Sequence, residues 1–550
     1  MTSVLVLALV LAQQATPPEK ATLSGTVVDS ITGQPLDKVR VIADHRHSEE
    51  PGASTTTDSK GEFTLVDLDP GEYQLGAKRS GYLETYYGAK GPRDDGSPII
   101  LTASQSVEDL RMKLTPFGVI AGTVRDSDGE PFAGAAVDLF GIVWQNGRRT
   151  ISSQTDELHT DDLGQFRIAG LKPGRYFLAA AASRRSDEDA TVDHSPKTAP
   201  HSDPAVTTFY PGTIDPDSAT PIDLAPGGRQ MGADITLIHS RLHKVIVHIQ
   251  AAPGLRTYGH LLYATEGFGE VGHERNSNKE ALEIVNVPSG SYILRFGAVV
   301  PQKSTPGVYD LTNSSDGCGS AIPVSINKED TVEINAVAPG CAHITGHITT
   351  DAGKPLKDAG GFGYEFVRDN EDDGHYFVKA DGSFRLTVSP GQHTLDFRDI
   401  TNSNNIYLKT IRSGSQDLLQ SGLTLSGGDH LDIEVVFGSD GGRVEGVVSD
   451  PDGKPAPAAT VVLIPNEAAL RTRPDHTPSV TTTHAGHYEL KGIAPGGYKL
   501  FAFENIEKDT WLDPDVLRDY ESRGAPVNVK PGDPDTQESP AQTVDLKLIQ

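Results

Sequence analysis

Several short patterns in the sequence contain residues that could bind a ligand or do chemistry. Residues 267–272 read GFGEVG and match the glycine spacing of a dinucleotide-binding loop. Such a loop binds phosphate where it follows a strand and opens a helix, because the amides of the helix then face the pyrophosphate. The residues after it, HERNSNKEALEIV, read instead as a loop followed by a strand. We therefore predict no nucleotide and no other cofactor.

Two aspartate-rich turns, DSDGEP from Asp126 and DPDGKP from Asp450, could offer carboxylates to calcium. A full calcium loop needs about six oxygen ligands, and both turns lack the later glutamate of the EF-hand pattern. Asp-Gly pairs also favour hairpin turns for backbone reasons alone. The sequence therefore favours turns over calcium sites.

Histidines occur in arrangements that could hold a metal ion. His45 and His47 alternate, so a strand would place both on one face. His343 and His347 would lie about 13 Å apart along a strand, which is too far for one ion. A third group lies near the boundary of the second and third units: His239, His243 and His248. We interpret all of these as surface or linker residues and predict no metal site.

The chain has only two cysteines, Cys318 and Cys341. In an exported protein they would pair across a loop of about 23 residues, or stay as two inert thiols. A nucleophilic role for the first, in DGCGSA, lacks a supporting local motif. The disulfide is the prediction that the structure can test.

Acidic residues are numerous, and two nearby carboxylates could act as the acid and base of a glycosidase. Nothing in the sequence selects such a pair from the 75 acidic residues. Neither H-E-x-x-H nor G-x-S-x-G occurs. We predict no catalytic residue and a protein that is not an enzyme; the alternative hypothesis is a hydrolase hidden in the divergent third unit.

The formal net charge is −27, and no basic block offsets it. A field of that sign repels phosphate backbones, so we expect no nucleic-acid partner. The apolar run Val4–Ala12 is too short to span a bilayer and suits a secretory signal peptide, with a buried first strand as the alternative. No other segment resembles a membrane helix, so we expect none in the mature chain.

One stretch, GEFTLVDLDPGEYQLGA at residues 61–77, occurs five times. Clear copies begin at Gly164 and Gly486, and weaker copies begin at Glu280 and Gly382. The copy from Gly382 is one residue shorter and has His393 where the others have tyrosine. The copies lie roughly 100 residues apart, which is the size of an immunoglobulin-like sandwich.

The repeated stretch reads as two strands joined by a Pro-Gly corner, because apolar residues alternate on both sides of it. In a sandwich, a tyrosine just after such a corner packs its ring inward while its hydroxyl bonds to upstream backbone. The structural corner residues are Pro70, Gly71, Tyr73, Pro173, Gly174, Tyr176, Pro495, Gly496 and Tyr498. Strand–turn–strand patterns open and close each unit, so we predict an all-β chain of five tandem Ig-like β-sandwich domains. The expected ranges are a signal peptide at 1–20 and sandwiches at 21–115, 116–240, 241–340, 341–440 and 441–550.

At these residues the chain resembles the carboxypeptidase regulatory-like domain family. The shared signature is G-x-V/I with D-x-x-G-x-P, followed by G-x-F/Y-x-L-x-x-L-x-P-G-x-Y-x-L. It is strong in the first, second and fifth units, fair in the fourth and poor in the third. The resemblance implies a transthyretin-like, carbohydrate-binding-like β-sandwich. It offers no catalytic residues, since in zinc carboxypeptidases such a domain accompanies the catalytic one.

Aromatic residues recur in the segments after the corner strand. Six of them are candidate binding residues: Tyr86, Tyr87, Phe209, Tyr210, Trp511 and Tyr520. Their rings could stack on a sugar or a peptide side chain, or could pack on the edge of the sandwich. We predict a non-catalytic, secreted or periplasmic protein of the cell envelope that binds a glycan or an envelope protein or acts structurally. The alternative is an interaction subunit of an envelope complex, and the oligomeric state is left open.

Overall fold

The computed structural model describes residues 19–46, 51–89, 96–145, 147–155, 158–182, 205–265, 267–274, 281–299, 317–327, 329–356, 365–368, 371–375, 378–379, 381–398, 400–401, 406–533 and 539–550. Most of the predicted signal peptide lies outside these ranges. The chain forms two compact units, Met1–Pro116 and Phe117–Gln550. Strands dominate both, and helix is confined to short segments such as α3 (Pro514–Arg518). The prediction of an all-β protein built of several sandwiches is confirmed.

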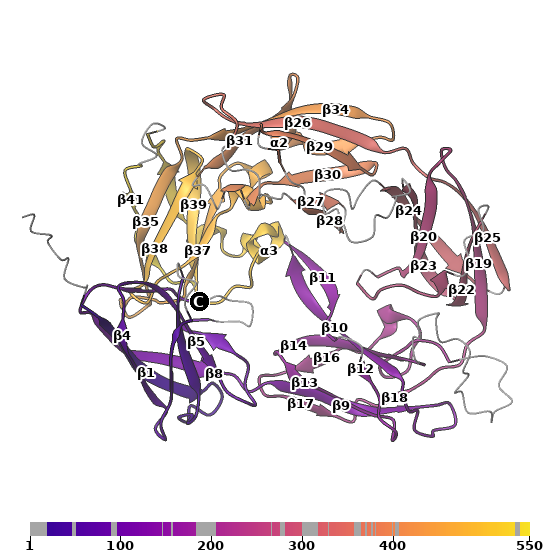
Figure 1. The fold of residues 1–550 in the computed structure, drawn as a ribbon, viewed down its shortest axis with the longest axis horizontal. Helices are drawn as coiled ribbons and strands as arrows, with labels where there is room; N and C mark the ends of the chain where they lie inside the picture. The colour runs from indigo at the N-terminus through magenta and orange to yellow at the C-terminus, as the bar shows by residue number, and fades with distance from the viewer. Residues whose placement is uncertain are drawn as a thin grey trace, which may run out of the picture. The chain divides into compact units, whose positions relative to one another are not determined.

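The first sandwich shows the plan that the others repeat (Figure 1). Its central strand β1 (Ala21–Asp29) pairs antiparallel with β4 (Glu62–Leu68) and parallel with β8 (Ser106–Leu114). The second sheet contains β3 (Ala53–Thr56), β2 (Arg40–His45), β5 (Gly71–Lys78), β6 (Thr85–Tyr86) and β7 (Ile99–Leu101). Apolar residues alternate along these strands, so the two inner faces enclose one core.

Four sandwiches follow within the second compact unit. The second pairs a sheet of β13 (Gln165–Leu171), β9 (Gly118–Arg125), β17 (Arg229–Met231) and β18 (Ile235–Thr236) with a sheet of β10 (Ala136–Gln145), β11 (Arg148–Ser153), β12 (Leu158–His159), β14 (Gly174–Ala181), β15 (Thr208–Phe209) and β16 (Ile222–Leu224). The third pairs β21 (His273–Glu274), β22 (Leu282–Pro288), β19 (Leu242–Gln250) and β25 (Thr331–Val337) with β20 (Arg256–Tyr263), β23 (Gly290–Val299) and β24 (Gly317–Ile326).

The fourth and fifth sandwiches keep the central strand between an antiparallel and a parallel neighbour. The fourth contains β29 (Ser383–Val388), β26 (Ala342–Thr350), β34 (His430–Gly438), β31 (Tyr407–Ser413) and β32 (Gln416–Asp417), with β28 (Glu371–His375), β27 (Glu365–Arg368), β30 (Gly391–Asp396) and β33 (Leu423–Leu425) opposite. The fifth contains β38 (His487–Ile493), β35 (Gly442–Ser449), β41 (Gln542–Thr543) and β42 (Leu546–Lys547), with β37 (Ser479–Thr481), β36 (Thr460–Pro465), β39 (Gly496–Phe503) and β40 (Ala525–Val529) opposite.

A β-bulge explains why the fourth repeat is one residue shorter. In the other units the strand before the corner carries an extra residue with positive φ, and its pairing with the central strand shifts register. These residues are Asp67, Gly170, Asn286 and Gly492. In the fourth unit the pairing runs without a shift from Ala342–Val388 to His347–Ser383. The missing residue is therefore the bulge.

A buried threonine fixes the opening turn of the first, second and fifth sandwiches. The Thr57 hydroxyl donates to the carbonyl of Leu36 at 2.7 Å and accepts the Val39 amide at 2.9 Å. Thr160 and Thr482 make the corresponding pairs of bonds. Each hydroxyl thus satisfies two backbone groups that no strand ladder reaches.

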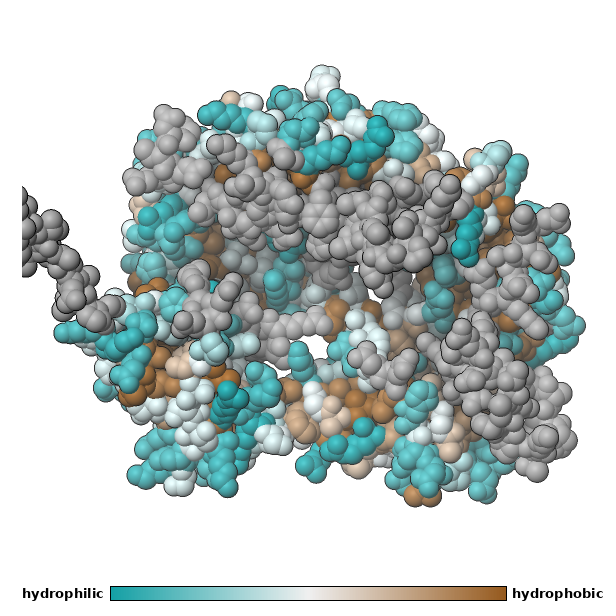
Figure 2. Space-filling view, in the orientation of Figure 1, coloured by the Kyte–Doolittle hydropathy of each residue, from teal (hydrophilic) through white to brown (hydrophobic). Residues whose placement is uncertain are grey.

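Hydrophilic residues cover the visible described surface, with apolar residues between them (Figure 2). The exposed large apolar side chains are spread along the described chain: Ile31, Val66, Ile100, Leu163, Met231, Leu255 and Val337. None of these is aromatic.

Candidate functional site

The corner residues form a hydrogen bond that recurs through the chain. The hydroxyl of Tyr73 donates to the carbonyl of Asp69 at 2.9 Å, just after Pro70 and Gly71. Equivalent bonds join Tyr176 to Lys172, Tyr292 to Pro288 and Tyr498 to Ala494. Pro173-Gly174 and Pro495-Gly496 occupy the same place, where β14 and β39 begin. Burial raises the pKa of these hydroxyls, so they stay protonated donors.

Tyr86 and Tyr87 lie against the second sheet of the first sandwich. Tyr86 is in β6 opposite Gly76, where its ring occupies the space beside the glycine. Tyr87 packs against the core, and burial raises the pKa of its hydroxyl. Both residues are half-buried.

Phe209 lies in a cluster of rings between the second and third sandwiches. It is fully buried, with ring centroids 5.2 Å from Phe268 and 5.4 Å from Tyr263. Phe140 and Phe177 of the second sandwich also contact Phe268 edge-on. Its neighbour Tyr210 is half-buried and packs on the core of the second sandwich.

The GFGEVG motif supplies Phe268 to this cluster. Gly267, Gly269 and Gly272 all have positive φ, which glycine adopts without strain. The motif is followed by strand β21, so in the described residues no helix begins directly after it. Its glycines serve a tight loop that carries one buried ring between two sandwiches.

Trp511 and Tyr520 pack on the outer face of the sheet formed by β36 and β39. Trp511 is 3% exposed and belongs to a small second core of the fifth sandwich. The ring of Tyr520 meets Phe503 edge-on at 5.1 Å. Trp511 also lines a pocket of about 280 Å³ with Arg471 and Glu521. Within the second compact unit, Phe209 and Tyr210 lie in the second sandwich and Trp511 and Tyr520 lie in the fifth, so these four candidates do not form one site.

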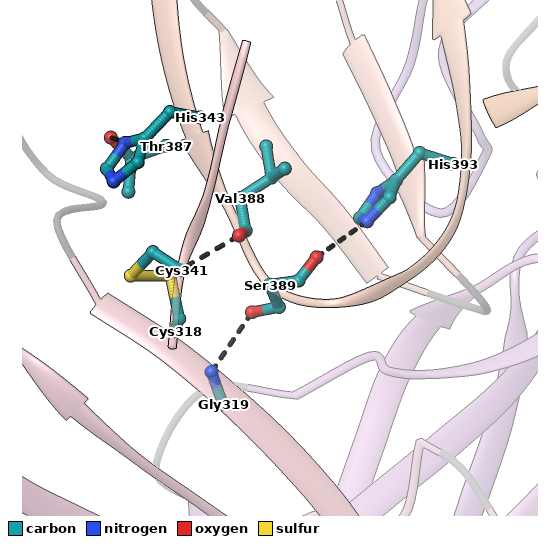
Figure 3. Close-up of a disulfide and its surroundings, with 8 residues drawn as sticks. All are labelled: Cys318, Gly319, Cys341, His343, Thr387, Val388, Ser389 and His393. Atoms are coloured by element: carbon teal, nitrogen blue, oxygen red, sulfur yellow. Dashed lines mark hydrogen bonds between the residues drawn. A yellow bond between two sulfur atoms is a disulfide. The ribbon is translucent and has the colours of Figure 1, made fainter. Parts of the chain in front are cut away.

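A disulfide joins the third sandwich to the start of the fourth (Figure 3). Cys318 lies in β24 and Cys341 directly precedes β26, with a Cα–Cα distance of 5.3 Å. Beside it, the amide of Gly319 donates to the hydroxyl of Ser389 at 3.0 Å. The carbonyl of Ser389 in turn lies 2.8 Å from Nε2 of His393, the residue at the corner position of the fourth unit. One serine therefore links the fourth corner to the third sandwich.

Several of the histidines and aspartates considered as metal ligands make contacts within the protein. The interpretation of all these histidines as surface or linker residues is wrong for His243, which is buried. Asp126 Oδ1 and Asp450 Oδ1 each accept two amides of their own turns. His243 bonds to Ser289 and Glu329, and His343 stacks on His430 at 5.0 Å. Among the residues that the structure describes, no group of three metal-ligating side chains occurs. His47 lies outside those residues.

A buried charge network joins the fourth and fifth sandwiches. Arg473 pairs with both oxygens of Asp475, at 3.0 and 2.6 Å, and donates to the carbonyl of Leu395 in the fourth sandwich at 2.8 Å. His476 Nδ1 lies 2.8 Å from the first of these oxygens. Asp396 pairs with Arg398 at 2.8 Å on the other side of the junction. The Asp475 side chain is fully buried, so its charge depends on these partners.

The two buried carboxyls of this network have opposite pKa shifts. Burial opposes the charge of Asp475, but the charge of Arg473 and the bond with His476 outweigh it and hold its pKa well below the usual range. Burial raises the pKa of Asp396, and Arg398 offsets this only in part while Asp475 adds to it. The junction therefore holds one carboxyl whose ionised form is favoured, Asp475, and one whose ionised form is disfavoured, Asp396.

A pocket of about 290 Å³ opens beside this network. The fourth sandwich contributes Tyr407, and the fifth contributes His476, residues of β37 and β38, and Tyr498. The Tyr407 hydroxyl donates to Asp440 at 2.8 Å. The pKa of Tyr407 is raised, mainly by burial and further by this bond to the Asp440 carboxylate. None of the predictions from the sequence named this site. The available signal was RPDH at residues 473–476, a charged tetrapeptide that does not occur elsewhere in the sequence.

Comparison with known proteins identifies the first two units. Residues 22–115 and 119–202 match the carboxypeptidase regulatory-like domain, so the chain contains two such domains in tandem. A search among curated proteins finds no match.

Among solved structures, the chain is similar to several pilins. The minor pilin GBS52 of Streptococcus agalactiae is 16% identical over 40% of this chain and 95% of its own, with a TM-score of 0.21. A streptococcal ancillary pilin is 11% identical over 56% and 98%, with a TM-score of 0.18. BcpA, the major pilin subunit of Bacillus cereus, is 13% identical over 78% and 99%, with a TM-score of 0.14. At these TM-scores the likenesses carry no argument about function.

Proposed function

We propose that this protein is a non-catalytic structural protein of the cell envelope, in which the second to fifth sandwiches act as one stiff spacer. The observation that carries this is how consecutive sandwiches meet. A ring cluster, a disulfide and a buried charge network occupy the three junctions. Cys318, Cys341, Arg473 and Asp475 thereby act in holding sandwiches together.

The disulfide supports an oxidising location, because such bonds persist in secreted and periplasmic proteins and are rare in the cytosol. It also weakens the alternative of a cysteine hydrolase in the third unit, since Cys318 carries no free thiol. In the described residues no helix is both long and apolar enough to cross a membrane.

Glycan contact is the finer part of the proposal. Tyr86, Tyr87, Tyr210 and Tyr520 are half-buried residues, whereas Phe209 and Trp511 are buried and act in packing. Replacing the four tyrosines with alanine tests this part, with retention on cell-wall polysaccharide as the readout. Unchanged retention would remove them from any binding role.

Cysteine labelling in cells tests the main proposal. In cells expressing the full chain, a maleimide-polyethylene glycol reagent applied after lysis in denaturant should modify both cysteines only after reduction. A matched chain lacking residues 2–20 should stay in the cytosol and react without reduction. Reaction of the full chain without reduction would contradict export, and turnover of ester, glycoside or peptide substrates by the pure protein would contradict a non-catalytic role.

A further inference from the structure

We propose that the pocket between the fourth and fifth sandwiches binds a neutral polyhydroxylated ligand about the size of one sugar ring. Nε2 of His476 would accept a hydrogen bond from a hydroxyl group of this ligand. The inference deepens the glycan part of the proposed function by naming a site for it. The spacer role does not depend on it.

The geometry around His476 defines what its free nitrogen offers. Asp475 is held ionised and accepts hydrogen bonds through both oxygens, so Nδ1 of His476 must donate to it. In the neutral ring, Nε2 then carries the lone pair and accepts. Within the described part of the chain no protein group bonds to Nε2, although the side chain is 5% exposed and lines the pocket. An acceptor of this kind, open to the pocket, can take a donor from a ligand or from water.

The charges around the pocket favour a neutral ligand. Asp475 is neutralised by Arg473, and Glu489 pairs with Lys491 at 2.9 Å and with Arg443 at 2.5 Å. A charged ligand would have to break one of these ion pairs to form an ion pair with the protein. Hydroxyl groups can instead bond to the exposed parts of the Glu489 and Lys491 side chains without displacing a charge.

The walls favour a small ring with an apolar face. The hydroxyls of Tyr407 and Tyr498 already donate to Asp440 and Ala494, so these residues offer ring surface to the pocket. Sugar C–H faces pack on such surface. Drug-sized ligands occupy pockets of roughly 300–1,000 Å³, and this pocket of about 290 Å³ is at the lower limit.

Saturation-transfer NMR on the full chain tests the proposal. The neutral probes are methyl glucoside, methyl galactoside and N-acetylglucosamine, and the charged probes are glucosamine and glucuronic acid. At least one neutral sugar should receive saturation. His476→Phe keeps the ring but removes the acceptor, so it should weaken that sugar's affinity roughly three- to tenfold. His487→Phe changes a histidine of β38 that lies outside the pocket and should leave the affinity within about twofold.

Two further measurements keep the outcome decisive if His476→Phe disturbs folding. Lys491→Ala alters a half-exposed side chain and should weaken the same sugar by roughly threefold. A capped tetra-alanine peptide tests the alternative that an extended chain pairs with the edge strands β37 and β38. Binding of the peptide or of a charged sugar alone, or sugar binding unaffected by both pocket variants, would overturn the proposal. The labelling result for export would stand in each of these cases.

Discussion

His393 Nε2 lies 2.8 Å from the carbonyl oxygen of Ser389, four residues before it. Tyr73 and Asp69 show the same spacing and nearly the same distance, 2.9 Å. The corner therefore needs a ring that packs inward and bonds to the fourth carbonyl upstream, and both imidazole and phenol can do so. In the fourth unit this arrangement occurs where the bulge is missing and where the third sandwich contacts Ser389.

Removing one corner hydroxyl should destabilise its sandwich measurably. Tyr73→Phe keeps the ring but leaves the Asp69 carbonyl without its donor, which should lower the free energy of unfolding by about 1 kcal/mol. Urea titration followed by hydrogen exchange of the β1 and β5 peptides measures it. Tyr86→Phe in the same sheet is the control and should change the free energy by less than about 0.5 kcal/mol. Equal effects of both would refute a special role of the corner bond.

The buried threonine should matter more than its size indicates. Thr57→Val preserves shape but leaves the Leu36 carbonyl and the Val39 amide unpaired, so a loss of about 2–3 kcal/mol is expected. The same hydrogen-exchange measurement reports it. Thr56→Val, at an exposed neighbouring position, should be nearly neutral. A neutral Thr57→Val would mean that water replaces both bonds.

Loss of the disulfide should destabilise the third sandwich and its junction. Closure of a 23-residue loop is worth about 3 kcal/mol in the chain-entropy model. Cys318→Ser combined with Cys341→Ser should lower the melting temperature of the third sandwich and its junction in calorimetry. Reduction of the wild type should do the same. The first sandwich forms a separate compact unit and serves as an internal control. An unchanged thermogram would contradict a stabilising role.

Breaking the buried network should be costly at neutral pH. Asp475→Asn leaves Arg473 without its counter-charge, so a loss of about 3–5 kcal/mol is expected, measured by urea unfolding with Trp511 fluorescence. Because the folded state lowers the pKa of Asp475, its stabilisation is present above its ordinary value of 3.8 and is lost as pH falls below that value. The cost of the variant should therefore shrink in acid. Asp452→Asn, in an exposed turn, is the control and should cost less than about 0.5 kcal/mol.

Asp396 should show the opposite pH dependence. Its pKa is raised in the folded state, so its stabilising contribution is fully present below the ordinary value of 3.8 and is lost as pH rises through the raised pKa. Relative to Asp396→Asn, the wild type should gain stability between pH 7 and pH 4. Unfolding curves across that range measure the difference. If the free energy of unfolding of the wild type relative to that of Asp396→Asn stayed constant or fell on acidification, the raised pKa of Asp396 would be contradicted.

Much of the fold could be predicted from the repeated stretch. Alternating apolar residues on both sides of Pro70-Gly71 predicted paired strands, and their recurrence predicted several sandwiches. The sequence also shows a threonine at one recurring position. Thr57, Thr160 and Thr482 each lie four residues before the glycine that opens a repeat. Their bonds could not be foreseen, because they reach backbone more than 15 residues away along the chain.

The sequence by itself determined the strands, their corners and the all-β class, because these depend on side-chain alternation and on turn residues that act over a few positions. Only the tertiary structure decided that Phe268 fills the space between two sandwiches, and that Arg473 reaches the carbonyl of Leu395. Those contacts join residues far apart in the chain. Their energies depend on burial and on the partner's position, which no local spacing encodes.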